Sequence, residues 1–277
     1  MRRKLVYFAV ALLALIFLIC PGIVKAQDLA PCAGLFADGQ PPALLNPELG
    51  RQTRPLCFRA FAVLHSGLTR GPLWSAEHLM RDDIESARTL QRVDAFHPES
   101  ALPPGERAEL SDYTRSGFDR GHMAPSGDMP DPQAQAQSFS LANMVPQAPD
   151  LNRKTWAGIE SAVRTLAVRH GALYVVSGPI FAGKDLQALN GRVLVPTEVF
   201  KAVYDPTIDG AGAYVCRNVD PTRCHTVSIA VLERRTGIDP FPSLSDPVKS
   251  RPMKLPRPTP YGYGRHHQRS LLEQLLR

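Results

Sequence analysis

The stretch SGFDRGHMAPSGDM, residues 116–129, brings an acid, a guanidinium and an imidazole together around one glycine. These groups belong to Asp119, Arg120 and His122, and a proline and a second glycine follow within five residues. Proline and glycine favour turns, so the three side chains are expected close together in a turn-rich context. Packing alone does not require this combination, so the stretch indicates a chemical role.

Cleavage of a phosphodiester bond is one reaction that needs these groups. A base must activate water, a cation must neutralise the charge that develops on the phosphate, and both must be rigidly placed. His122 suits the base, because its ordinary pKa leaves the imidazole largely neutral at pH 7. Arg120 suits the phosphate, which a guanidinium binds with paired hydrogen bonds.

The clearest helix signal lies in TWAGIESAVRTLAVRHG, residues 155–171. Apolar side chains recur there at spacings of three and four residues, and Gly171 is a good terminator. Trp156 is expected to serve core packing.

Residues 141–160, LANMVPQAPDLNRKTWAGIE, supply oxygen donors around the start of this helix. A hard cation such as Mg²⁺ prefers oxygen ligands and keeps most of its water, so one protein amide oxygen is enough to hold it. Asn143, Gln147 and Asn152 offer such oxygens, and Glu160 follows Asn152 by eight residues. In a helix that separation is about 80° of rotation and about 12 Å of rise, so both side chains share one broad face. Glu160 is therefore expected to hold a metal-bound water rather than the metal itself.

Together, DRGHMAPSGDM and NMVPQAPDLNRKTWAGIE resemble the DNA/RNA non-specific endonucleases. That family's pattern is a DRGH segment, then N-x-x-P-Q, then L-N before a W-x-x-[LI]-E helix, and all three parts occur in order within residues 119–160. The resemblance extends more loosely over about residues 55–245. It implies the ββα-metal fold, an α+β architecture in which the active-site helix packs against a mainly antiparallel sheet.

The resemblance also implies roles for individual residues. His122 would be the general base, Asn152 the single direct metal ligand, and Glu160 would bind metal-coordinated water. The implied cofactor is Mg²⁺, with Mn²⁺ as a substitute, and the implied substrates are DNA and RNA, cut with little sequence specificity.

Three further residues complete the implied site. Arg120 would contact phosphate, and Asn143 would support the active site. The family uses an upstream arginine near the leaving group, for which Arg92 in LQRVDAF is the best match. Of the other acids, Asp119 is expected to fix the turn or orient Arg120, and Asp128 and Asp131 to serve as loop or cap residues.

A signal peptide is predicted over residues 1–26. MRRK is a basic start, a long apolar run follows, and VKA before Gln27 fits a cleavage site. A retained membrane anchor is the alternative, because the run approaches the length of a span; Pro21 and Gly22 interrupt the run and favour cleavage. A lipid anchor at Cys20 is disfavoured, since Ile19 stands where a small residue would be expected. The mature protein is expected to be secreted or periplasmic, without stable membrane association.

Four cysteines follow the leader, which predicts two disulfides in an exported chain. Three pairings are possible, and the simplest is local: Cys32 with Cys57, and Cys216 with Cys224. A zinc site is the alternative, but no CxxC pair supports it.

The basic charge is concentrated at the two ends of the chain. The whole chain carries +6; residues 1–26 hold four basic residues and no acid, and residues 248–277 hold seven basic residues and one acid. The body, residues 27–247, therefore carries −4, and its charge alone says little about nucleic-acid binding. The Pro-rich tail 248–277 is expected to be unfolded and to bind phosphates, with Tyr261 and Tyr263 stacking on bases; a dispensable solvated terminus is the alternative.

Along the body, strands are expected to dominate around the one strong helix. An extended arm over residues 27–56, a loop with one helical turn over 102–117 and a short helix starting the segment 131–144 are predicted. The segments 57–66 and 71–79 form a hairpin through GLTR. Further strands are predicted at residues 172–181, 192–205, 211–216 and 225–233.

Two other functions compete with a nuclease. One is a phosphodiesterase that uses the same site on smaller esters, and the other is a nucleic-acid-binding or uptake protein with an inactive site. The presence of His122, Asn152 and Glu160 together counts against the second. Any inhibitor partner and the oligomeric state are left open.

Overall fold

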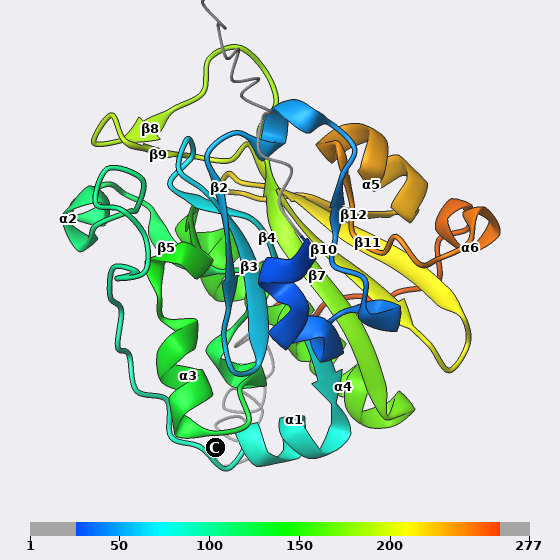
Figure 1. Cartoon of the computed structure of the whole chain (residues 1–277). Helices are drawn as coiled ribbons and strands as arrows, with labels where there is room; N and C mark the ends of the chain where they lie inside the picture. Colours follow the sequence, from blue (N-terminus) through cyan, green and yellow to red (C-terminus); the bar gives the residue numbers. More distant parts are fainter. Residues whose placement is uncertain (1–25, 261–277) are drawn as a thin grey trace, which may run out of the picture.

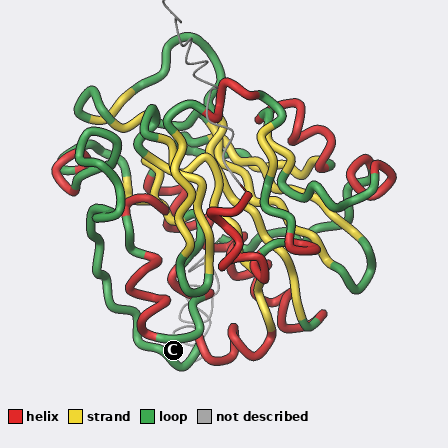
Figure 2. The backbone as a smooth tube through the Cα atoms, in the orientation of Figure 1, coloured by secondary structure: helices red, strands yellow, loops and turns green. Residues whose placement is uncertain are grey.

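Seven strands form one antiparallel sheet at the centre of the molecule (Figures 1 and 2), in the order β12-β11-β10-β7-β4-β3-β2. Their bounds are β2 (Thr53–Cys57), β3 (Phe61–Ser66), β4 (Gly71–Met80), β7 (Ala172–Ile180), β10 (Glu198–Asp205), β11 (Gly210–Arg217) and β12 (Cys224–Val227). The computed structural model describes residues 26–260, so the predicted leader, up to residue 25, and residues 261–277 with Tyr261 and Tyr263 lie outside it. The predicted β3–β4 hairpin and the α+β class are confirmed.

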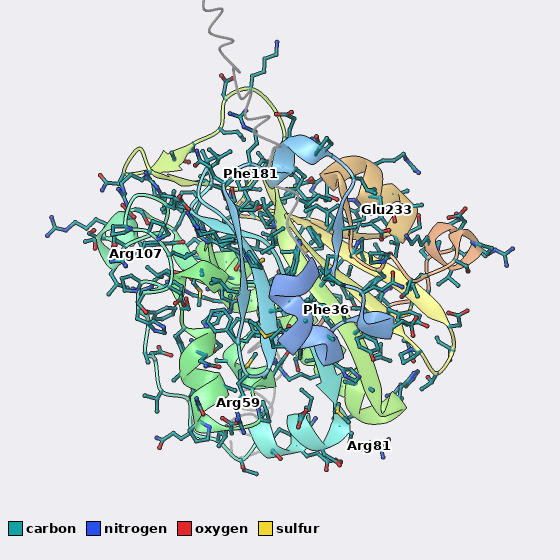
Figure 3. All side chains as sticks on the ribbon, in the orientation of Figure 1. Phe36, Arg59, Arg81, Arg107, Phe181 and Glu233 are labelled. Atoms are coloured by element: carbon teal, nitrogen blue, oxygen red, sulfur yellow. A yellow bond between two sulfur atoms is a disulfide. The ribbon has the colours of Figure 1, made fainter. Side chains whose placement is uncertain are left out.

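One face of the sheet is covered by the N-terminal turns and by two later helices. The turns are η1 (Ala26–Leu35) and η2 (Ala37–Gly39), which cross the front of the sheet in Figure 1, and the helices are α5 (Ile229–Thr236) and α6 (Asp246–Ser250). Phe36 reaches the sheet from the turns (Figure 3) and meets Trp74 edge-on, with ring centroids 6.2 Å apart. Burial of such large apolar groups stabilises this layer.

The opposite face carries the helix that the sequence predicted most clearly. Helix α4 (Ala157–His170) continues from a π-helical turn, η6 (Leu151–Trp156), and ends at Gly171, whose φ of 97° is one that glycine adopts without strain. Its apolar side packs with α1 (Arg81–Ala87) against the sheet. Trp156 is fully buried in this layer, as predicted.

The remaining elements are short. The helices are α2 (Leu110–Tyr113) and α3 (Pro132–Ser138), and Asp131 caps α3 by accepting from the backbone N–H groups of Gln133 and Ala134, as predicted. The other strands and turns are β1 (Ala43–Leu44) with β13 (Ile238–Asp239), β5 (Asp119–His122) with β6 (Met144–Gln147), β8 (Ala188–Leu189) with β9 (Val193–Leu194), and η3 (Pro47–Gly50), η4 (Ser126–Asp128) and η5 (Leu141–Asn143).

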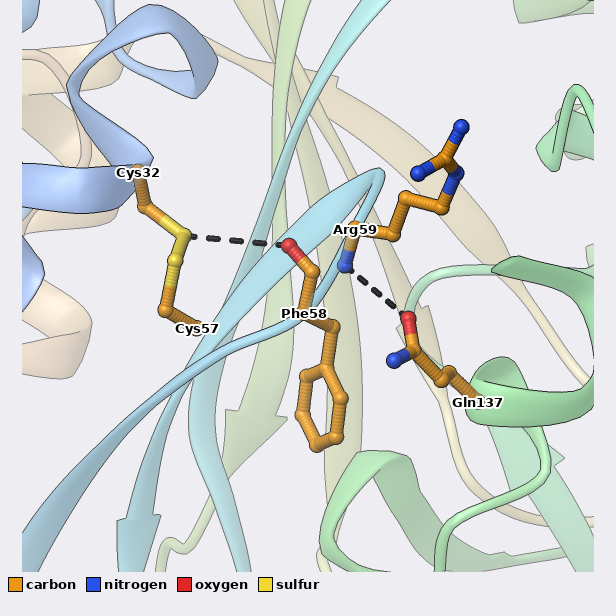
Figure 4. The surroundings of a disulfide bond; sticks show 5 residues. All are labelled: Cys32, Cys57, Phe58, Arg59 and Gln137. Carbon is orange, nitrogen blue, oxygen red and sulfur yellow. Dashed lines mark hydrogen bonds between the residues drawn. A yellow bond between two sulfur atoms is a disulfide. The ribbon is translucent and has the colours of Figure 1, made fainter. Parts of the chain in front are cut away.

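Both predicted disulfides are confirmed. Cys32 bonds to Cys57 and Cys216 to Cys224, with Cα atoms 5.8 and 4.1 Å apart. Beside the first of them, Arg59 donates its backbone N–H to Gln137 Oε1 at 2.9 Å, which links the β2–β3 turn to α3 (Figure 4). The disulfide therefore ties the N-terminal turns to a sheet edge that α3 also holds.

Two predictions of local structure are wrong. The arm 27–56 is not extended: it forms helical turns that bury Leu29 and Phe36 on the sheet, and its last residues form edge strand β2. The strand predicted over residues 225–233 ends at Val227 and gives way to α5. The reason is Ser228, whose side chain accepts from the Val231 N–H and starts a helix that the alternating apolar pattern concealed.

The prediction of an unfolded tail is wrong for residues 248–260. The boundary expected at residue 247 falls inside α6, and Lys249 forms ion pairs with Asp239 and Glu233. Residues 251–260, here called the C-terminal strap, then follow the sheet: Met253 N–H donates to the Ala211 carbonyl at 2.8 Å. The buried Asp239 and the half-buried Glu233 attract the lysine, and β11 offers the Ala211 carbonyl to the backbone, so this part of the tail is ordered.

The strap continues from β11 to helix α4. Tyr214 donates its hydroxyl to the Pro256 carbonyl at 2.6 Å, and Leu255 is buried. The Thr259 carbonyl lies so close to Gly158 that a Cβ there would overlap it. The strap thus reaches the first turn of α4, two residues from Glu160.

Candidate active site

The opening stretch forms strand β5, which pairs with β6 beside helix α4. Asp119 lies opposite Gln147, Gly121 opposite Val145, and His122 opposite Met144. A Cβ at Gly121 would overlap the buried Gln147 side chain, so the glycine is required by close approach. Gln147 therefore has a structural contact with the motif.

Asn143 fixes the turn that follows His122. Its side chain is fully buried, and its Oδ1 accepts from Ser75 Oγ at 2.9 Å and from the Ala124 N–H at 3.0 Å. Its Nδ2 donates to the carbonyls of Ala124 and Ser138 at 2.7 and 2.9 Å. With both amide atoms used, Asn143 supports the site from behind and has no free group to offer a substrate.

His122 is a buried imidazole between two aromatic rings. Its ring centroid lies 4.9 Å from that of Phe139 and 5.7 Å from that of Phe96. The pKa of His122 is lowered to about 3, mainly by burial and then by the charge of Arg92, while the charge of Asp94 opposes the shift. The imidazole is therefore neutral at physiological pH, the form that can accept a proton.

Asp119 orients the predicted metal ligand. Asn152 donates through Nδ2 to Asp119 Oδ2 at 2.9 Å, which leaves its Oδ1 unused in this contact. Arg153 holds the same carboxylate with two hydrogen bonds, at 2.7 and 2.6 Å. Burial acts to raise the pKa of Asp119, but these hydrogen bonds and the nearby arginine charges outweigh it, so the pKa is lowered. We expected Asp119 to fix the turn or orient Arg120. Its carboxylate instead contacts Asn152 and Arg153.

Glu160 lies on the same helix, α4, as Arg164, which forms an ion pair with the buried Asp128 of η4. Arg164, one turn later, donates to Asp128 Oδ1 at 2.6 Å, so Asp128 is more than a loop residue. Burial raises the pKa of Glu160 to about 7, against the opposing charges of Arg164 and Lys201. A cation bound nearby would favour the charged carboxylate.

The two predicted arginines reach the site from different segments, Arg120 from strand β5 and Arg92 from the loop after α1. Arg120 stacks on Phe96, with its Cζ 4.1 Å from the ring centroid. Arg92 is exposed, pairs with Asp94 at 2.6 Å and donates to Ser126 Oγ at 3.3 Å.

A single cleft of about 770 Å³ joins these groups. Five of the six predicted site residues line it, and Asn143 lies behind it; the five are Arg92, Arg120, His122, Asn152 and Glu160. Sequence reasoning missed Arg153, Arg164 and Phe96, which also line the cleft. Arg164 had a usable signal, since it lies four residues after Glu160 and so on the same side of a helix.

The donor set fits one hard cation. Within residues 26–260, no cluster of three or more His, Cys, Asp or Glu side chains is placed to hold a metal. Asn152 and Glu160 instead offer an amide oxygen and a carboxylate to the same cleft, the oxygen chemistry that Mg²⁺ prefers when it keeps most of its water.

Comparisons with known proteins give three kinds of match. A family model for DNA/RNA non-specific endonucleases matches residues 41–246. Nuclease C1 of Cunninghamella echinulata var. echinulata is 33% identical over 205 residues, covering 67% of the chain and 81% of that protein. The mitochondrial endonuclease G of Bos taurus is 32% identical over 249 residues, covering 79% and 82%. The mitochondrial nuclease EXOG of Danio rerio is 35% identical over 220 residues, covering 72% and 63%.

A solved structure shows the same architecture. A chain in the crystal structure of the EndoG/EndoGI complex, which concerns the mechanism of EndoG inhibition, matches with a TM-score of 0.60 at 27% identity. The match covers 66% of this chain and 84% of that chain. Among the helices described between residues 26 and 260, none combines the length and apolar character needed to cross a bilayer.

Proposed function

The chain belongs to the DNA/RNA non-specific endonuclease family, and from this premise we propose that it is a Mg²⁺-dependent endonuclease that cuts DNA and RNA with little sequence specificity. A metal-dependent hydrolase of phosphodiester bonds is the enzyme class that the family carries. The observation that supports the finer assignment is the cleft in which a neutral imidazole, two oxygen donors and several arginines meet.

His122 is proposed as the general base. Because Nε2 is enclosed and has no hydrogen-bond partner among the described residues, we infer that Nδ1 receives the proton. His122 removes a proton from water, the water oxygen bonds to phosphorus, and the leaving oxygen departs and takes up a proton from solvent. A base with a pKa near 3 is weak, but a bound phosphodiester anion would raise that pKa and so strengthen the base.

Asn152 and Glu160 are proposed to hold the cation. Asn152 would bind it through Oδ1, which Asp119 orients by holding the amide nitrogen. Glu160 would act on its water shell, as the second oxygen donor of the cleft. When bound, Mg²⁺ neutralises charge on the phosphate and the leaving oxygen.

Arg92 and Arg120 are proposed to bind phosphate. Both line the cleft, and Phe96 holds the guanidinium of Arg120 in place without neutralising it. Among the described residues Arg120 has no carboxylate partner, so its donors stay available for phosphate oxygens, whereas Arg92 would exchange or share its contact with Asp94.

The deciding experiment is digestion of supercoiled plasmid and of RNA with and without EDTA. Cleavage of both in Mg²⁺ that EDTA stops supports the proposed function. Hydrolysis of bis(p-nitrophenyl) phosphate without plasmid cleavage would favour the small-ester phosphodiesterase. Binding of nucleic acid with neither activity would favour an inactive binding protein.

We infer a secreted or periplasmic location from the two disulfides, which persist in oxidising compartments, and from the predicted leader. Several relatives are mitochondrial proteins, so an organelle is the competing destination. An inhibitor protein is a candidate partner, because a similar fold occurs in the EndoG/EndoGI complex.

Removal of residues 261–277 tests whether the C-terminal tail binds nucleic acid. This segment holds three arginines and one glutamate, and its loss is expected to raise KM on long DNA, to leave kcat unchanged and to flatten the dependence of log affinity on log salt. The measurement is a salt titration of binding to a 40-mer duplex. An unchanged slope would show a dispensable terminus.

A chain lacking residues 248–277 serves as the contrast. It also loses the Lys249 ion pairs and the strap contacts, so its urea midpoint is expected to fall. The shorter deletion is expected to keep the midpoint of the full chain, which separates binding from stability.

A further inference from the structure

Four buried polar side chains interrupt the apolar face of the sheet beneath the active site. Ser75, Ser177 and Lys201 stand opposite one another on neighbouring strands β4, β7 and β10, and Glu77 follows Ser75 on the same face of β4. Each is at most 1% exposed. None of these four side chains has a role in the proposed mechanism; Ser75 alone contacts one of the predicted site residues, Asn143.

Lys201 reaches from this row to the backbone of the catalytic turn. Its Nζ donates to Ser177 Oγ at 2.7 Å and to the Met123 carbonyl at 3.3 Å. Met123 follows His122 directly, and the His122 carbonyl accepts from Trp156 Nε1 at 3.3 Å. Two consecutive carbonyls at the base are therefore held, one from helix η6 and one from the sheet.

Ser75 makes a second attachment between the same row and the same turn. Its hydroxyl donates to Asn143, which holds both backbone groups of Ala124. The sheet is thus fastened to residues 123 and 124 at two points, directly after the proposed base.

A lysine at this position costs stability. A buried ammonium loses its hydration, and an apolar side chain of similar length is often as stable or more stable in such a place. Lys201 has no carboxylate within ion-pair distance among the described residues, and both oxygens of Glu77 lack a hydrogen-bond partner there. Burial, then the charge of Asp128, raises the pKa of Glu77 well above its ordinary value, so this carboxyl is biased toward its neutral form. The ammonium is therefore held by Ser177, the Met123 carbonyl and the Trp156 ring, 5.6 Å from its Nζ, rather than by an ion pair.

We propose that Lys201 is a positioning residue for His122: its buried ammonium fixes the Met123 carbonyl and thereby the backbone that carries the imidazole. This rests on the proposed function, since it needs His122 as the base. A displacement of about 1 Å in a catalytic group can cost about 10²-fold in rate, so one buried hydrogen bond to this turn is enough to matter.

The test is Lys201→Met, an apolar side chain of similar length. We expect kcat on DNA to fall about 10- to 100-fold, with KM within about twofold of the wild type, in a protein that is fully folded by near-UV circular dichroism and urea titration. A merely structural role would lower the urea midpoint without changing kcat in the folded protein.

Lys249→Met is the matched control. Lys249 is also a buried lysine, but its partners are Asp239 and Glu233, away from the cleft. It is expected to lose stability and to keep kcat. Folded Lys201→Met with kcat within twofold of the wild type, or an equal fall in kcat in both variants, would overturn the proposal.

If Lys201→Met does not fold, Ser177→Ala decides. This variant removes the hydrogen bond from the Lys201 ammonium to Ser177 but keeps the lysine. We expect kcat to fall less than the range given for Lys201→Met, with KM unchanged. Unchanged kcat in folded Ser177→Ala would then overturn the proposal. Wild-type protein in the same Mg²⁺ assay tests the proposed function separately, because that function fails if the wild type does not cleave.

Discussion

His122→Ala lowers kcat on DNA by about 10²- to 10⁴-fold, the usual contribution of a general base, while the affinity for nucleic acid changes little. The reason is that His122 is neutral and buried, so it transfers a proton but adds no charge to the binding surface. Single-turnover cleavage of a labelled duplex gives the rate, and fluorescence anisotropy in Ca²⁺ gives the affinity.

His78→Ala is the control for this variant. His78 is a histidine outside the cleft that stacks on Tyr174, with ring centroids 4.1 Å apart. Its loss is expected to leave kcat unchanged. Near wild-type turnover of His122→Ala in Mg²⁺ would remove His122 from the role of base.

The same side chain also makes stability depend on pH. The pKa of His122 is about 3 in the folded protein and about 6.5 in an unfolded chain. Protonation therefore favours the unfolded state: the contribution of neutral His122 is fully present above pH of about 6.5 and is lost as the pH falls toward 3. His122→Gln is expected to flatten the fall of the urea midpoint over this acid range.

Asn152→Ala is expected to raise the Mg²⁺ concentration for half-maximal activity by about 10- to 100-fold, comparable with the effect of losing a supporting residue at a metal site. The amide oxygen would be the single direct protein ligand, whereas Asp119 keeps its two hydrogen bonds to Arg153, so the local fold persists. The measurement is initial rate against Mg²⁺ concentration.

Glu160→Gln is the companion variant. Acting on the water shell, it is expected to reduce activity less than Asn152→Ala at saturating Mg²⁺. If Glu160→Gln proves the more damaging change in the metal titration, the two roles are reversed.

Local signals explain why much of the site could be predicted from the sequence. His122 and Asn152 lie in two short motifs, and the β5–β6 pairing with α4 keeps those motifs together. Arg92 was harder to place, because only the folded loop brings it to Ser126.

The residues that were missed depend on contacts between distant segments. In the sequence, Lys201 is only one polar residue within a predicted strand. Its role depends on the fold, which places β10 so that Lys201 reaches the carbonyl of Met123. Likewise, Ser228 is compatible with a strand in the sequence, and only the folded chain shows that its side chain caps α5. Residues 251–260 carry no helix or strand pattern of their own, and their partner Tyr214 lies 42 residues before Pro256.

The position of the C-terminal strap near the end of the sequence affects the order in which the contacts of the fold can form. Ribosomes synthesise a chain from its N-terminus, so residues 251–260 emerge after every residue that lines the catalytic cleft. The strap contacts at Gly158 and Tyr214 are consequently among the last to form. An unfinished chain therefore lacks the final packing of the helix that carries Glu160.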